Sequence, residues 1–126
     1  MTIQTFFYKR LKSFSYALTG IGSFIRREPN AWVHCTAIVI VTVAGLAFGI
    51  TRTEWMAVIG CFAGVLAAEA FNTAIERLVN LVSPEYHPIA GDVKDIAAGA
   101  VLICAIGAAL IGILIFFPYL TASLFG

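Results

Sequence analysis

Residues 31–50 read AWVHCTAIVIVTVAGLAFGI, a run without Asp, Glu, Lys or Arg that decides the class of fold. A helix needs about 20 mostly apolar residues to cross a bilayer. Two further stretches meet this length, at about residues 55–75, with its helix extending to 82, and at about 96–117. Helices satisfy their own backbone hydrogen bonds inside hydrocarbon. The sequence therefore predicts an all-α membrane protein with three transmembrane helices.

The composition of the whole chain agrees with a membrane protein. Of 126 residues, 60% are hydrophobic and only 12% are charged, which is too apolar for a water-soluble globule. The net charge is +1 and no basic run is interleaved with aromatic residues, so we expect no nucleic-acid partner. The three cysteines stand singly without C-x-x-C spacing and are expected to be inert buried thiols. We expect one domain over residues 1–126, with no removable signal peptide.

The segment before the first span, about residues 5–27, is predicted to be an amphipathic helix with a basic face. Its apolar positions recur at steps of three and four: Phe7, Leu11, Phe14, Leu18, Ile21 and Ile25. Such a helix packs against a bundle or lies in anionic cytoplasmic headgroups, and both interpretations remain open. We favour the membrane surface.

The distribution of Lys and Arg predicts the orientation in the membrane. Five of the eight precede position 28, and none follows Lys94. The positive-inside rule then places the N-terminus and the loop of residues 82–95 in the cytoplasm. Small residues, among them the pair Gly60 and Gly64 at G-x-x-x-G spacing, predict close helix contacts and self-association.

Polar residues within the second span are the strongest functional signal. Glu69, Asn72, Thr73 and Glu76 share one helical face, with the two carboxylates ~10 Å apart along the axis. Ionisable residues inside a membrane are costly, so by default they indicate a functional site. The alternative is a structural polar seam paired with Arg77 or with a neighbouring subunit.

A second group of candidates lies on the cytoplasmic side. After the loop Ser83–Pro88, Asp92, Lys94 and Asp95 are expected to open the third helix, whose N-terminus would favour a phosphate. An equally open alternative is that an Asp caps this helix and Lys94 is solvated. Glu28 adds a carboxylate at the same face, and carboxylates suit Mg²⁺ shared with nucleotide phosphates. We expect His34 to be packed or interfacial rather than a ligand.

These residues alone are compatible with phosphoryl transfer, proton conduction or ion transport. The chain has no G-x-x-x-x-G-K-[ST] loop and no protein-kinase signature set. However, Glu69-x-x-Asn72-Thr73-Ala74-Ile75-Glu76-x-x-Val79, followed by Lys94-Asp95-x-Ala97-Ala98-Gly99-Ala100-Val101, resembles the small bacterial diacylglycerol kinase and undecaprenol kinase family. The likeness covers nearly the whole chain, and its one visible departure is Asn80, where the family motif usually has Asp.

The resemblance implies a homotrimeric lipid kinase of the bacterial plasma membrane, with ATP as co-substrate, Mg²⁺ as cofactor and active sites between subunits. It implies that Glu28 and Glu76 hold Mg²⁺ and that Glu69 is the general base on the lipid hydroxyl. The other residues to which it gives roles are Asn72 for orientation, Lys94 for phosphate charge, Asp95 in the nucleotide site, Tyr16, Tyr86 and His87 on ATP, and Lys9 and Lys12 on its phosphates.

The choice of lipid is predicted from other residues. Residues 27–34 and the pair Glu54-Trp55 resemble the undecaprenol kinase branch more than the diacylglycerol kinase branch. Two rival functions stay open from the residues: a proton- or ion-conducting oligomer with Glu69 and Glu76 in a pore, and a non-catalytic membrane assembly subunit.

Overall fold

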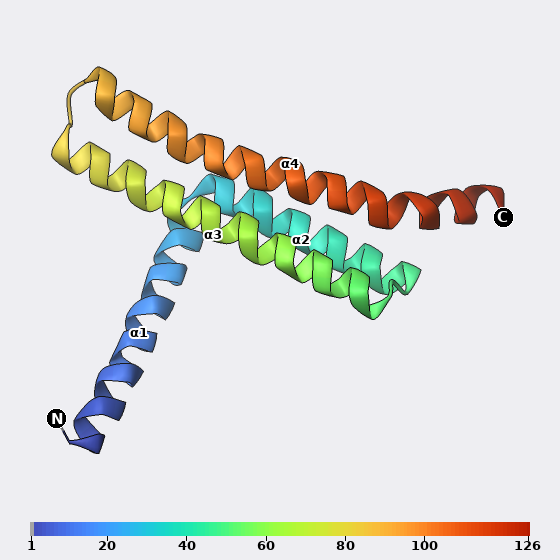
Figure 1. Cartoon of the computed structure of the whole chain (residues 1–126), viewed down its shortest axis with the longest axis horizontal. Coiled ribbons are helices and arrows are strands. Elements are labelled where there is room, and N and C mark those ends of the chain that lie inside the picture. The colour runs from blue at the N-terminus through green and yellow to red at the C-terminus, as the bar shows by residue number, and fades with distance from the viewer. Residues whose placement is uncertain (1) are drawn as a thin grey trace.

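A computed structural model describes residues 2–126 and contains four helices in that range, with no strand (Figure 1). They are α1 (Ile3–Arg27), α2 (Pro29–Phe48), α3 (Arg52–Val82) and α4 (Pro88–Phe125). The last three are long and apolar enough to cross a membrane. The prediction of an all-helical chain with three candidate spans is therefore confirmed.

A short turn joins α2 to α3 and makes them an antiparallel pair. Gly49 ends α2 with φ of 62°, a left-handed conformation that glycine adopts without steric cost. Thr51 then caps α3: its hydroxyl accepts from the Glu54 amide, and the Glu54 carboxylate accepts from the Thr51 amide. This capping box fixes where α3 begins.

The apolar core of the chain lies near this turn. Ile50, Val58 and Ile115 form a buried cluster, against which Trp55 and other partly buried side chains pack. A methyl group added at Gly45 would lie 2.8 Å from the Trp55 ring, so α2 and α3 touch here through a glycine. Most other large apolar side chains are exposed, which suits helices surrounded by lipid.

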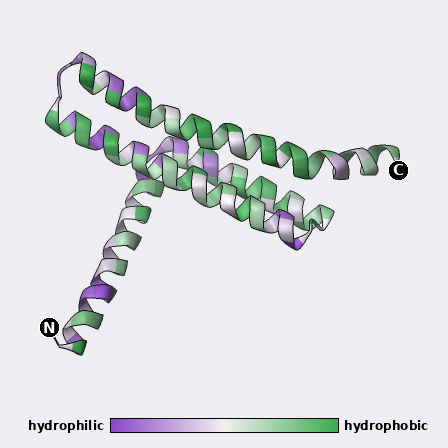
Figure 2. Cartoon of the chain, in the orientation of Figure 1, coloured by the Kyte–Doolittle hydropathy of each residue, from purple (hydrophilic) through white to green (hydrophobic). Residues whose placement is uncertain are grey.

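Helix α1 leaves the three-helix bundle sideways and meets it only near the start of α2 (Figure 1). Glu28 is extended and separates the two helices, and Pro29 occupies the first turn of α2, where its missing N–H is not needed. The Trp32 indole N–H donates to the Ile25 carbonyl at 2.6 Å across this corner. Hydrophilic residues gather at this corner and at the α3–α4 loop (Figure 2).

The helix that carries the third expected span extends beyond residues 96–117 at both ends. Helix α4 begins at Pro88, before the residues 92–95 that were expected to open it, so the connection from α3 is only residues 83–87. The His87 ring accepts from the Ile89 amide at 3.2 Å and caps the helix, with Pro88 in its first turn. At its other end, α4 continues past Pro118 to Phe125.

Candidate functional site

The polar face of α3 is largely buried within the single chain. Glu69, Asn72 and Thr73 are 3%, 6% and 4% exposed, and among residues 2–126 they are the buried polar side chains. The Asn72 amide donates to Glu76 Oε1 at 3.5 Å, a long hydrogen bond. The Asn72 Oδ1 atom is buried and has no hydrogen-bond partner. Because a buried unpaired oxygen costs free energy, it indicates a partner that this chain alone does not supply.

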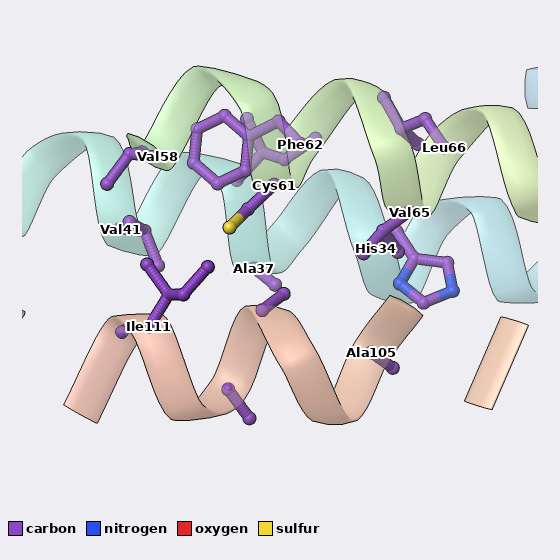
Figure 3. A pocket seen from close by; sticks show the side chains of 14 residues that line it. His34, Ala37, Val41, Val58, Cys61, Phe62, Val65, Leu66, Ala105 and Ile111 are labelled. Carbon is purple, nitrogen blue, oxygen red and sulfur yellow. The ribbon is translucent and has the colours of Figure 1, made fainter. Parts of the chain in front are cut away.

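Helix α2 places one side chain beside Glu69. The His34 Nε2 atom lies 3.8 Å from Glu69 Oε2, within ion-pair range but beyond a hydrogen bond. His34 also lines one end of an apolar cavity of about 330 Å³ between α2, α3 and α4 (Figure 3). Apart from His34 and Cys61, the lining is aliphatic, aromatic or glycine.

Arg77 connects α3 to the corner between α1 and α2. Its Nη2 donates to Glu28 Oε1 at 2.9 Å, and its Nη1 donates to Ser23 Oγ at 3.4 Å. The pair is partly exposed, at 45% for the Arg77 side chain and 23% for Glu28. Glu28 is thereby held next to the turn of α3 that carries Glu76. The sequence identified Glu28 as a candidate and offered Arg77 only as a partner of the polar face of α3, whereas Arg77 pairs with Glu28, 49 positions away.

A further polar contact joins the C-terminal end of α3 to the N-terminal part of α4. Lys94 Nζ donates to Asn80 Oδ1 at 3.0 Å, a link between the two helices. Lys94 is half-buried, whereas Asp95, Tyr86 and His87 are exposed. Lys94 lies six residues inside α4, ~9 Å from its start. The helix N-terminus therefore does not lie beside Lys94, as was expected, and neither Asp92 nor Asp95 caps it, because His87 takes that role.

The candidates on α1 lie apart from those on α3 and α4. Lys9, Lys12 and Tyr16 are exposed, and the Lys12 ammonium lies 5.8 Å from the centre of the Tyr16 ring. Their part of α1 projects away from the bundle (Figure 1). The single chain thus brings Glu69, Asn72 and Glu76 together and links Lys94 to Asn80, but it does not bring the α1 residues to either group.

The acidic residues decide whether this chain has side chains that could coordinate Mg²⁺. Within residues 2–126, no three His, Cys, Asp or Glu side chains come together as a ready-made metal cluster. Mg²⁺ in kinases usually takes only one or two carboxylates, with phosphate oxygens and waters completing its shell. Glu76, Glu28 and the Asn72 Oδ1 atom are oxygen ligands of this kind: Asn72 lies beside Glu76, and Glu28 pairs with Arg77, the residue after Glu76. The residues present therefore fit Mg²⁺ arriving with a nucleotide. The three cysteines are free but half-buried, so the expectation that they would be buried was wrong.

One buried and one half-buried acid on the same helical face, in a small bundle that suits lipid, indicate a functional site within a membrane protein. The sequence profile of the prokaryotic diacylglycerol kinase family matches residues 15–116, and the chain belongs to this family. It is a lipid kinase, and its apolar helices and family indicate a bacterial membrane protein. Family membership thus favours a kinase over a pore or an assembly subunit. Lys9 and Lys12 precede the matched residues.

Individual relatives agree with the family assignment. The undecaprenol kinase of Bacillus subtilis is 39% identical over 86% of this chain and 89% of its own length. The diacylglycerol kinase of Synechocystis is 36% identical over 81% of this chain and 59% of its own length. The diacylglycerol kinase of Haemophilus influenzae is 30% identical over 84% and 92%, respectively. Both substrate classes expected from the sequence thus occur among the relatives.

Proposed function

We propose that the chain is an ATP- and Mg²⁺-dependent kinase of a membrane lipid with a primary hydroxyl, and that undecaprenol is favoured over diacylglycerol. The observation that carries this proposal is the buried polar face of Glu69, Asn72 and Thr73 on α3. Within it, the Asn72 Oδ1 atom has no hydrogen-bond partner. The lean to undecaprenol rests on residues 27–34 and Glu54-Trp55, and on the 39% identity to the Bacillus subtilis enzyme.

Glu69 is proposed as the general base because it is the most buried acid and lies on the apolar side of Glu76. Its carboxylate removes the proton of the lipid hydroxyl as that oxygen bonds to the γ-phosphorus of ATP. The bond from the γ-phosphorus to the bridging oxygen breaks, and ADP leaves with the electron pair. Asn72 orients the reacting groups. Positioning and charge neutralisation are most of what phosphoryl transfer asks of a protein.

Glu28 and Glu76 are proposed to hold Mg²⁺, which when bound offsets the charge of the phosphates. Arg77 already pairs with Glu28, so this carboxylate is held toward α3 before any nucleotide binds. Lys94 offsets further phosphate charge, and Asp95, Tyr86 and His87 lie at the same end of the bundle for contact with ATP. Tyr16, Lys9 and Lys12 are proposed to contact ATP from α1.

We propose a homotrimer with shared active sites because α1 stands apart from the other candidate site residues in the single chain. In one chain the N-terminal part of α1 projects away from α3 and α4 (Figure 1), so α1 of a second copy would supply the proposed contacts with the nucleotide. A methyl group added at Gly60 or Gly64 would meet nothing within 4 Å, so this small-residue face is open to a second copy. We further propose that α1 lies on the cytoplasmic surface, with the N-terminus in the cytoplasm.

The first test is phosphate transfer in mixed micelles containing Mg-ATP and either undecaprenol or diacylglycerol. We expect labelling of a lipid, with undecaprenol the better substrate. Glu69→Gln should lower kcat by ~10² to 10⁴, the usual contribution of a positioned general base. Its unfolding midpoint should hold or rise, because neutralising a buried carboxylate removes a desolvation cost.

The matched control is Glu85→Gln, which neutralises an exposed loop carboxylate and should leave kcat unchanged. Wild-type turnover in Glu69→Gln would refute the assignment of the base. Failure of the folded wild-type protein to label either lipid would refute the proposed substrates.

A further inference from the structure

Glu69 is a buried carboxylate that lacks the partners such a group normally has. It is 3% exposed, and no side chain among residues 2–126 hydrogen-bonds it. A buried charge needs a hydrogen-bond or charge partner to offset its desolvation. The only basic side chain within 4 Å of its oxygens, among the described residues, is His34.

Among the described residues, Glu69 is the only side chain with which His34 makes a polar contact. It comes from α2 and keeps 21% of its side chain exposed, so it lies at the edge of the buried region. The walls of its cavity on α4 are Ala105, Ala108 and neighbouring apolar residues, which offer the ring no side-chain acceptor. In Figure 3 the ring lies at the end of the cavity. Cys61, the other polarizable group of the lining, lies eight residues before Glu69 on α3.

The 3.8 Å separation is closed by a side-chain movement of less than 1 Å. Hydrogen bonds of catalytic groups are often long without substrate and tighten when it binds. A histidine in this position also differs from a lysine or arginine in its charge, because the imidazole can donate an N–H while neutral. It can hold a carboxylate oxygen without a permanent full charge, which leaves the second oxygen available to a substrate proton.

We propose that His34 is a positioning residue of the kinase, whose Nε2–H donates to Glu69 Oε2 and aims the other carboxylate oxygen at the lipid hydroxyl. This inference rests on the proposed role of Glu69 as general base. In a metal site, partners that orient a ligand in this way are worth ~10- to 100-fold in activity, and we expect an effect of that size here.

Two substitutions of similar volume separate a hydrogen-bonding role from packing. His34→Leu fills the space without a donor, whereas His34→Gln keeps an N–H that can reach the carboxylate. Cys35→Ala is the control, since it changes the neighbouring residue of α2, which does not line the cavity. Each variant is assayed with Mg-ATP and the lipid that the wild-type enzyme labels best, and kcat, KM for ATP and the unfolding midpoint are measured.

We expect His34→Leu to lower kcat ~10- to 100-fold, with KM for ATP unchanged, and His34→Gln to recover most of this loss. Cys35→Ala should match the wild type. The proposal is overturned if the Leu and Gln variants have the same kcat, whether both are as active as the wild type or equally impaired. Absence of lipid labelling by the wild-type enzyme is a different result, because it refutes the proposed function itself.

Discussion

Asn80→Asp is a small change at the contact between α3 and α4 with a calculable effect on nucleotide binding. Asn80 Oδ1 accepts from Lys94 Nζ at 3.0 Å, so the neutral amide holds the ammonium without offsetting its charge. Aspartate at the same place keeps the geometry and adds a full negative charge. Lys94 would then be part of an ion pair, and a phosphate would have to compete with that pair.

The magnitude follows from the exposure of the contact. Asn80 is exposed and Lys94 half-buried, so the pair is worth only the ~0.2 to 1 kcal/mol typical of surface ion pairs. At ~1.4 kcal/mol per tenfold, this raises KM for ATP about 1.4- to 5-fold, with kcat little changed. The increase should shrink as salt is raised, because exposed charges are screened.

The assay is initial-rate kinetics with varied Mg-ATP at low and high salt, at saturating lipid. Asn80→Ala is the control: it removes the acceptor without adding charge, so KM for ATP should stay the same or fall. A KM for Asn80→Asp equal to or below that of the wild type at low salt would contradict the proposed role of Lys94. So would an increase of equal size at high salt.

Three further predictions concern the metal, the core and the assembly. Glu76→Gln should raise the Mg²⁺ and ATP concentrations needed for half-maximal rate, since it removes a proposed ligand, and unchanged titrations would contradict that role. Gly45→Ala should lower stability by ~1 to 3 kcal/mol in detergent unfolding, because the new methyl meets the Trp55 ring at 2.8 Å. Gly20→Ala, which meets nothing within 4 Å, should be neutral or stabilising; equal effects would exclude the packing explanation. Gly60→Leu should convert cross-linked oligomers to monomers, and an unchanged cross-linking pattern would remove this face from the interface.

The helices were predictable because their signals are local. An uninterrupted apolar run of about 20 residues has few alternatives to a spanning helix. The start of α4 was missed although its signal was present, since Pro88 suits the first turn of a helix and His87 precedes it. The charges of Asp92, Lys94 and Asp95 predict a helix that opens at these residues. Here α4 instead carries those charges well inside its length.

The candidate site was only partly predictable, because its contacts depend on how the helices sit against one another. The shared face of Glu69, Asn72 and Glu76 follows from helical periodicity within one segment. The pairs Arg77 with Glu28 and His34 with Glu69 depend on the register between α2 and α3, which periodicity within either helix does not contain.

Depth along α3 relates the polar face to the two substrates of the proposed reaction. Glu69 lies ~12 Å along the axis before Arg77, which contacts the α1–α2 corner, and Asn80 lies ~5 Å beyond Arg77. Burial falls in the same order: Glu69 is buried, Glu76 half-buried and Asn80 exposed. If α1 lies on the membrane surface, the base is below that surface and Lys94 is above it. A lipid hydroxyl then meets the base from the apolar side, while ATP phosphates reach Glu76 from water. Because the polar face is continuous, the lipid can stay on its apolar side and ATP on its aqueous side. The proposed transfer would then take place near Asn72, whose buried oxygen lacks a partner in the chain alone.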